Sequence, residues 1–229
     1  MSSIVHTFFT PDPTWTKIGT ASAQLARDWA DEQGFQHQIT TKRVWTATPS
    51  ITWEKIRILA DSIDSHDYDW HIFVDADMFV TNPGKTLKEI GLGDRLVYMG
   101  SDWIFPLNTG FLAVRKEARG LLEEMKRLRF GNPHEYFEQG TFQVIRTLSK
   151  KWSREIVPLT PRACNSYPPD AGEEWGGNWM PGDFVVHFAG WQKGDVSRFI
   201  APTLGPKMNI LLQDLLKKTR EDVLKKRGD

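Results

Sequence analysis

The chain has 229 residues, 29 basic and 29 acidic side chains and 40% hydrophobic residues. This length supports one sizeable core, and the balanced charge gives no overall field to attract nucleic acid, so we expect no nucleic-acid partner. No apolar run of the sequence approaches the ~20 residues of a membrane span, and the first residues lack a signal-peptide pattern. We therefore expect a soluble, cytoplasmic protein, unless an anchor has been removed.

The first third of the chain predicts alternating strands and helices. Apolar runs at 4–9 and 35–41, and a third run ending at Asp75, are typical of strands. Apolar residues recur at helical spacing over 17–33 and 51–63, so helices are expected there. Strands that alternate with helices imply a parallel sheet joined by right-handed crossovers.

The rest of the chain continues this pattern with shorter elements. Residues 165–182 are rich in Pro, Gly, Glu and Trp, which predicts a long loop of functional or mobile character. Cys164 is the only cysteine, so no internal disulfide can form, and we expect a packed thiol. No linker is visible, so we predict one α/β domain over 1–229 with a mixed, mainly parallel sheet. Its further strands are expected at 96–100, 111–114, 156–159 and 184–187, and its further helices at 87–90, 115–129, 137–149 and 206–227.

Two acids follow the apolar residues 72–74, and they organise the functional interpretation. Asp75 and Asp77 are two positions apart, so on an extended chain both face one point beyond the carboxyl end of the strand. Neighbouring carboxylates repel unless a positive group lies between them, and oxygen ligands favour a hard divalent cation such as Mg²⁺ or Mn²⁺. The alternative is that the two acids simply open a solvated turn.

His187 also ends an apolar strand. A single histidine in such a place is more often a hydrogen-bonded core residue than a ligand. However, Gly190 allows the backbone to approach a ligand closely, and Lys193 provides a mobile positive charge suited to phosphate. Two acids, an imidazole and a lysine together predict a site for a metal-bound diphosphate.

Four motifs in this order carry a family resemblance. They are Val-Asp-Ala-Asp at 74–77, Asn-Thr-Gly at 108–110, Glu-Gln at 138–139 and His-Phe-Ala-Gly-Trp-Gln-Lys at 187–193. Together they resemble the retaining nucleotide-sugar glycosyltransferases of the GT-A fold, closest to glycosyltransferase family 34. The last motif also resembles glycogenin and the lipopolysaccharide galactosyltransferases. The resemblance covers residues 4–193 and implies a Rossmann-like GT-A domain with a nucleotide-binding half over 1–84 and an acceptor half over 85–200.

The resemblance also implies residue roles. Asp75, Asp77 and His187 match the metal ligands, and Gly190 and Lys193 match the contacts to the donor diphosphate. Glu138 stands where the family more usually has Asp, and Gly194 stands where a proline often follows the lysine. On the donor side the matching positions are Thr7, Phe8, Thr10 and Ala76, and on the sugar and acceptor side they are Asn108, Thr109, Glu138 and Gln139.

Several of these residues have ordinary explanations as well. Asn108 before Thr-Gly fits a common turn, and acidic residues such as Glu138 are favoured in the first turn of a helix. Lys55 and Arg57 precede the acidic strand and are candidates to face the phosphates, although at least one is expected on a solvated helix face. The terminal helix carries basic residues opposite its apolar stripe. It is a candidate for weak contact with an anionic membrane surface, and packing against the domain is the ordinary alternative.

The implied function is metal-dependent transfer of a hexosyl or pentosyl group, with Mn²⁺ or Mg²⁺ and a UDP-sugar donor. The acceptor is expected to be a hydroxyl of a glycan or glycoconjugate, and the family implies retention. An inverting enzyme would instead need a carboxylate base, such as Glu138, Glu173 or Glu174. A non-catalytic glycan- or nucleotide-binding protein is a further alternative. A phosphatase of the haloacid dehalogenase type also uses Asp-x-Asp, but Phe79 stands where that site needs Thr or Val.

Overall fold

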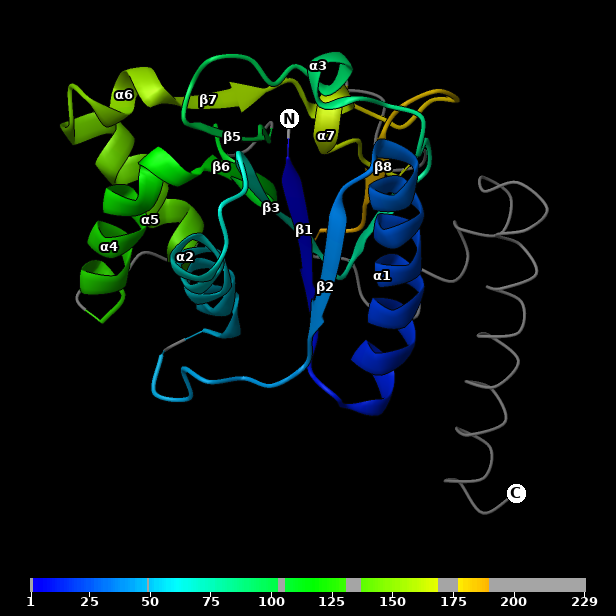
Figure 1. Ribbon diagram of the computed structural model, residues 1–229, viewed down its shortest axis with the longest axis horizontal. Helices are drawn as coiled ribbons and strands as arrows, with labels where there is room; N and C mark the ends of the chain where they lie inside the picture. The colour runs from blue at the N-terminus through cyan, green and yellow to red at the C-terminus, as the bar shows by residue number, and fades with distance from the viewer. Residues whose placement is uncertain (1, 49, 103–105, 131–136, 169–176, 190–229) are drawn as a thin grey trace.

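A six-stranded sheet, with strand order β2-β1-β3-β6-β5-β7, forms the centre of the protein (Figure 1). The computed structural model describes residues 2–48, 50–102, 106–130, 137–168 and 177–189. Parallel pairing joins β1 to β2 and β3, and joins β5 to β7, whereas β6 is antiparallel to both of its neighbours. The strands span Ser3–Phe8 (β1), Gln36–Thr40 (β2), Trp70–Asp75 (β3), Val97–Gly100 (β5), Asn108–Arg115 (β6) and Ile156–Leu159 (β7).

Helices cover both faces of this sheet, because side chains alternate between the faces along each strand. Ile72 of β3 packs in a core cluster with α1, and its neighbour Phe73 packs in a second cluster with the helices of the other face. Figure 1 shows α1 on one side of β1 and α2, α4 and α5 on the other. These helices span Pro13–Gln33 (α1), Glu54–Ser65 (α2), Arg119–Leu128 (α4) and Phe137–Leu148 (α5).

Two of the expected helices begin later than the sequence pattern suggests. Strand β6 continues to Arg115, and a 3₁₀ turn at Lys116–Ala118 precedes α4. A second 3₁₀ turn, Ile51–Trp53, precedes α2, and Ser50 caps this turn by accepting a hydrogen bond from Thr52 N. Both turns are short and keep the apolar spacing of a helix, so periodicity alone does not distinguish them from one. The remaining described helices have four residues each: Leu87–Ile90 (α3), Trp152–Glu155 (α6) and Pro161–Cys164 (α7).

A second, two-stranded sheet lies beside the central one. Strand β4 (Met78–Val80) pairs in antiparallel fashion with β8 (Val185–His187), and the register places Met78 opposite His187. The strand expected near 184–187 is thus present, but it joins the residues just after the acids and not the central sheet. This pairing brings together residues separated by more than 100 positions in the sequence.

Other expectations concern the surface, the cysteine and the end of the chain. Cys164 is fully buried, and burial raises the pKa of its thiol well above the usual range, so the expected packed thiol is confirmed. Among the helices that the structure describes, none combines the length and the apolar character that a membrane crossing requires. Gly190, Lys193 and the expected terminal helix, with its membrane contact, lie outside the described residues. The domain limits expected from the sequence stay predictions.

Candidate active site

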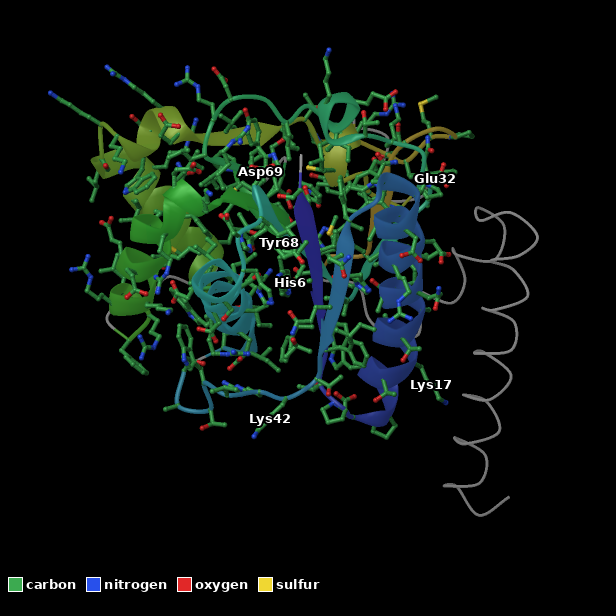
Figure 2. The ribbon with its side chains drawn as sticks, viewed as in Figure 1. His6, Lys17, Glu32, Lys42, Tyr68 and Asp69 are labelled. Atoms are coloured by element: carbon green, nitrogen blue, oxygen red, sulfur yellow. The ribbon has the colours of Figure 1, made fainter. Side chains whose placement is uncertain are left out.

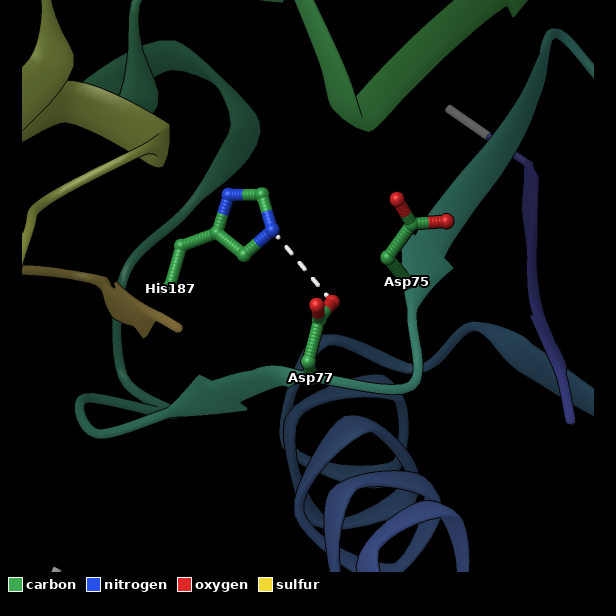
Figure 3. A group of neighbouring side chains, drawn as sticks. All are labelled: Asp75, Asp77 and His187. Atoms are coloured by element: carbon green, nitrogen blue, oxygen red, sulfur yellow. Dashed lines mark ion pairs between the residues drawn. The ribbon is translucent and has the colours of Figure 1, made fainter. Parts of the chain in front are cut away.

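Three side chains capable of holding a cation converge at the carboxyl end of β3. Asp75 ends that strand, Asp77 lies in the turn before β4, and His187 ends β8. One ligand atom from each lies within 4.8 Å of the others, and His187 Nε2 is 3.3 Å from Asp77 Oδ1. Figure 3 shows the three side chains pointing toward one common space. Two carboxylates and an imidazole suit Mg²⁺ or Mn²⁺.

The turn that carries the acids is held from the side of α1. The Ser22 hydroxyl lies 2.6 Å from the Met78 carbonyl oxygen and 3.3 Å from that of Asp75. Ala76, between the two acids, is buried against Phe9. The backbone between the acids is therefore fixed while their carboxylates face outward, with 28% of the Asp75 side chain and 23% of the Asp77 side chain exposed.

Lys55 of α2 extends its buried side chain to the Asp75 carboxylate. Its side chain is 3% exposed, and its Nζ lies 2.9 Å from Asp75 Oδ2 and 3.4 Å from Glu138 Oε1. The same Nζ donates to the Thr109 carbonyl oxygen at 3.0 Å. It also donates to Thr109 Oγ1 at 3.3 Å, so its three hydrogen bonds go to Asp75 and Thr109 while Glu138 is an ion-pair partner, and Lys55 links α2, β3, β6 and α5.

The electrostatics of the site are dominated by burial and by opposite charges. Burial raises the pKa of Asp75 to about 6; Lys55 opposes this shift and Asp77 adds to it. Burial also acts to raise the pKa of Asp77, but His187 and Lys55 outweigh it and the pKa is lowered. For Lys55, burial acts to lower the pKa, yet Asp75 and Glu138 raise it above its usual value. Three carboxylates around one ammonium leave a formal charge of −2, which a divalent cation would balance.

Two surface cavities, each of about 250 Å³, meet at this cluster. Both include Thr52, Lys55, Asp75 and Asp77 in their linings. We name the first the aromatic cavity, because its lining includes Phe8, Phe9, Trp15 and Phe73. We name the second the polar cavity, because its lining includes Asn108, Thr109, Glu138, Gln139 and His187.

The polar cavity gathers the side chains expected on the sugar and acceptor side. Glu138 is 3% exposed and accepts a hydrogen bond from Thr109 Oγ1 at 3.0 Å. Gln139 Oε1 accepts from Thr109 N at 3.3 Å, and Asn108 Oδ1 accepts from Gly110 N at 2.8 Å. Asn108 and Thr109 belong to β6 and not to a preceding turn, because this antiparallel strand starts beside the end of β3.

The donor-side expectations have mixed outcomes. Phe8, Thr10 and Ala76 line the aromatic cavity, whereas Thr7 does not. Thr7 is fully buried and its hydroxyl lies 3.3 Å from His37 Nε2. The correction follows from strand alternation: Phe8 pairs with Asp75 at the sheet edge, so the side chain of Thr7 points to the opposite face.

The two basic candidates on α2 also separate. Lys55 enters the site, whereas Arg57 pairs with Glu54 and Asp61 along the helix. Six lining residues were not among the expected site residues, because no motif marks them: Phe9, Trp15, Ile51, Thr52, Phe73 and Phe137.

Comparison with known proteins identifies the fold. No protein-family model and no curated protein sequence matches the chain. Among solved structures, a glycosyltransferase involved in the glycosylation of the major capsid of PBCV-1 is similar, with a TM-score of 0.68 and 16% identity over 86% of this chain and 97% of that chain. The apo form of the glycosyltransferase GlyE from Streptococcus pneumoniae TIGR4 has a TM-score of 0.55 and 13% identity, over 96% of this chain and 64% of that chain. The bifunctional glycosyltransferase WbbM has a TM-score of 0.54 and 14% identity, over 93% of this chain and 51% of that chain.

These similarities confirm the α/β fold of the GT-A type that the sequence predicts. The chain spans nearly the whole of the first structure, but less than two thirds of GlyE and about half of WbbM. The closer resemblance to family 34 and to glycogenin stays a prediction.

Proposed function

We propose that this protein is a metal-dependent glycosyltransferase. It takes a sugar from a nucleoside diphosphate donor, of which a UDP-sugar is the first to test, and transfers it to a hydroxyl of a glycan or glycoconjugate. The observation that carries the proposal is the meeting of the aromatic and the polar cavity at the Asp75–Asp77–His187 cluster. A nucleotide sugar has the same three parts in the same order: a flat base, a charged diphosphate and a polar sugar.

The donor set supports Mn²⁺ or Mg²⁺ as the cation. Asp75 and Asp77 offer carboxylate oxygens and His187 offers a ring nitrogen, all within 4.8 Å of one another. The raised pKa of Asp75 indicates that its charge lacks full compensation from Lys55 alone. When bound, the cation would supply Lewis-acid stabilisation of the charge that develops on the leaving diphosphate.

The residues of the aromatic cavity would bind and orient the nucleoside. Phe8 and Trp15 offer ring faces on which a base can stack, and Thr10 offers a hydroxyl beside them. Lys193, which lies outside the described residues, is proposed from the resemblance to add positive charge at the diphosphate together with Gly190.

In the polar cavity, Lys55 pairs with Asp75 and Glu138, and Gln139 accepts a hydrogen bond from Thr109 N. Gln139 would face the transferred sugar. Retention, which the family resemblance implies, is proposed over inversion; of the three candidate bases, Glu173 and Glu174 lie outside the described residues, and Glu138 lines this cavity. In the part of the chain that the structure describes, Glu138 is the one carboxylate of its lining besides the two acids of the cluster. Glu138 contacts Lys55 and Thr109, so it is poorly placed to serve as a free base. The leaving phosphate would then take the acceptor proton.

A thermal-shift experiment tests the donor half of the proposal. We expect UDP with MnCl₂ to raise the melting temperature, and UDP with EDTA to leave it unchanged. Ligand at 100 times its dissociation constant stabilises by about 2.7 kcal/mol, which is readily measured. Asp75→Asn should abolish the response, whereas Asp67→Asn, at an exposed ion pair with Lys116, should keep it.

Three results would count against the proposal. No response of the wild type to UDP, GDP, CDP or dTDP in the presence of Mn²⁺ would overturn it. Binding of equal strength with Mn²⁺ and with EDTA would favour a non-catalytic binding protein. Transfer that persists in Asp75→Asn would exclude the metal-dependent reaction.

A further inference from the structure

Behind His187, on the side away from the acids, lies a buried asparagine that no motif marks. Asn165 follows α7 directly, is 0% exposed, and its Oδ1 is hydrogen-bonded to His187 Nδ1. We propose that Asn165 is a positioning residue that sets the tautomer and the orientation of His187 for cation binding. This inference rests on the metal site of the proposed function.

The orientation of the Asn165 amide follows from its second contact. Its Nδ2 lies 2.9 Å from the Ser101 carbonyl oxygen. A carbonyl oxygen only accepts hydrogen bonds, so the amide nitrogen must face Ser101 and the amide oxygen must face His187. The Ser101 backbone is itself fixed, because Ser101 N donates to the Leu159 carbonyl oxygen at 2.9 Å.

The tautomer of His187 follows from that orientation. The amide oxygen of Asn165 cannot donate, so Nδ1 of the ring must carry a proton and donate it. When a cation is bound, the neutral ring then directs the lone pair of Nε2 at it; without a cation, a proton on Nε2, the atom 3.3 Å from Asp77 Oδ1, would be donated to that carboxylate. A lone pair that faces carboxylates is suited to a cation between them. Ring nitrogens that bind metals commonly depend on such a partner at the other nitrogen.

Two glycines leave room for this pair on neighbouring strands. A Cβ on Gly110 of β6 would lie 2.5 Å from His187 Cε1 and 3.0 Å from its Nδ1. A Cβ on Gly100 of β5 would lie 2.8 Å from Asn165 Cβ. The sheet thus approaches both side chains at contact distance, so the ring has little freedom to turn or shift.

The backbone adds a third constraint. His187 N donates to the Ser166 carbonyl oxygen at 2.8 Å, so the segment after α7 holds His187 by its main chain and by its ring. A purely structural role would need only the backbone contact and a filled volume. The two hydrogen bonds of the Asn165 side chain, to the Ser101 carbonyl oxygen and to His187 Nδ1, also determine which ring nitrogen is available to a cation.

Two substitutions distinguish a role of Asn165 in positioning the His187 ring from a role in filling space. Asn165→Leu keeps a similar volume without an acceptor, and Asn165→Asp keeps an acceptor for Nδ1–H. Titration calorimetry with MnCl₂ at pH 7.5 should show affinity reduced 10- to 100-fold in Asn165→Leu, the usual effect of losing such a partner. The Mn²⁺ affinity of Asn165→Asp should be no more than tenfold below that of the wild type. Asn82→Leu, in an exposed loop where Asn82 donates to the Gly182 carbonyl oxygen, is the matched control and should bind like the wild type.

A second readout does not depend on the metal. Nitrogen-15 NMR of histidine-labelled protein in EDTA, with the His187 signal assigned from His187→Gln, should show a proton on Nδ1 in the wild type and in Asn165→Asp, whether or not Nε2 also carries a proton toward Asp77. Asn165→Leu should shift the ring toward the Nε2–H form.

If Asn165→Leu does not fold, Asn165→Asp decides: an Nε2–H ring with no proton on Nδ1, or a more than tenfold loss of Mn²⁺ affinity in folded protein, would overturn the proposal. So would a folded Asn165→Leu with wild-type tautomer and wild-type affinity. If the wild type itself binds no Mn²⁺, the proposed function fails while the tautomer measurement still tests Asn165.

Discussion

Buried histidines occur in two clusters, one at the end of β8 in the two-stranded sheet and one on β1 and β3 of the central sheet, and their surroundings differ. His187 is 4% exposed and faces the carboxylate of Asp77. His6 of β1 and His71 of β3 are 1% and 0% exposed, and they face the Ser62 hydroxyl of α2 at 2.9 Å and 2.7 Å. Figure 2 labels His6 between β1 and α2.

The difference lies in the neighbours and not in the degree of burial. Burial lowers the pKa of His6 to about 3 and that of His71 to about 4, and the charges acting on His6 come from His71, His37 and His66. Both rings therefore stay neutral and act as hydrogen-bonding core residues. At the candidate active site, carboxylates and an open cavity surround an equally buried ring. The degree of burial of a histidine thus says little about its role; the groups that other strands and helices bring to it decide.

The largest expected effect concerns the charge at the centre of the active site. Lys55→Met should reduce the free energy of unfolding by about 3–5 kcal/mol in EDTA, because it leaves Asp75 and Glu138 without their buried counter-charge. Urea unfolding at pH 7.5 measures this. Lys116→Met, at an exposed pair with Asp67, is the control and should change stability little. Similar losses in both variants would refute the central role of Lys55.

Substitution of one histidine in each cluster distinguishes a metal ligand from a core residue. His187→Gln should weaken Mn²⁺ binding by at least about 100-fold, since a direct ligand should matter no less than its supporting partner. His71→Gln should bind Mn²⁺ like the wild type, although it is less stable because a buried hydrogen bond changes. Calorimetric titration of both variants provides the measurement. Equal weakening in the two would show that the clusters do not differ as described.

We expect the buried neutral rings of His6 and His71 to make stability depend on pH. The unfolded chain binds protons at His6 and His71 near pH 6.5, whereas the folded protein binds them only near pH 3 and pH 4. Stability from this cluster is therefore fully present above pH 6.5 and is lost as the pH falls toward these folded values. The loss should be roughly 2 kcal/mol between pH 6.5 and 5.5 for the two rings together. Urea unfolding across this range checks it, and His71→Gln should remove about half of the slope; an unchanged slope would contradict the prediction.

A further effect, of similar size, concerns the space beside His187. Gly110→Ala should cost about 1–3 kcal/mol, because the added methyl group would overlap the His187 ring. It should also weaken Mn²⁺ binding, whereas Gly120→Ala in α4 meets nothing within 4 Å and should be neutral or slightly stabilising. Thermal melts with and without MnCl₂ compare the pair. A Gly110→Ala protein with unchanged stability and Mn²⁺ response would show that the ring has free room.

The sequence by itself determined the local elements and half of the site. Apolar period and turn residues located the longer strands and helices to within a few residues, because both are local properties of the chain, whereas the short β4, α6 and α7 were not predicted. The spacing of Asp75 and Asp77 after an apolar strand was sufficient to place two carboxylates at a sheet edge. The positional match to the family was less reliable at the end of β1, where Phe8 lines the aromatic cavity and Thr7 does not.

Only the tertiary structure decided what these acids meet. The antiparallel course of β6 brings Thr109 and Asn108 to the end of β3, and the pairing of β8 with β4 brings His187 to Asp77. The burial of Lys55, 54 residues before Thr109 in the sequence, depends on how α2 packs against the sheet. The contact between Asn165 and His187 depends on α7 and on two glycines of other strands. Strand order, register and helix packing result from the whole chain burying its apolar surface at once, so no local pattern contains them.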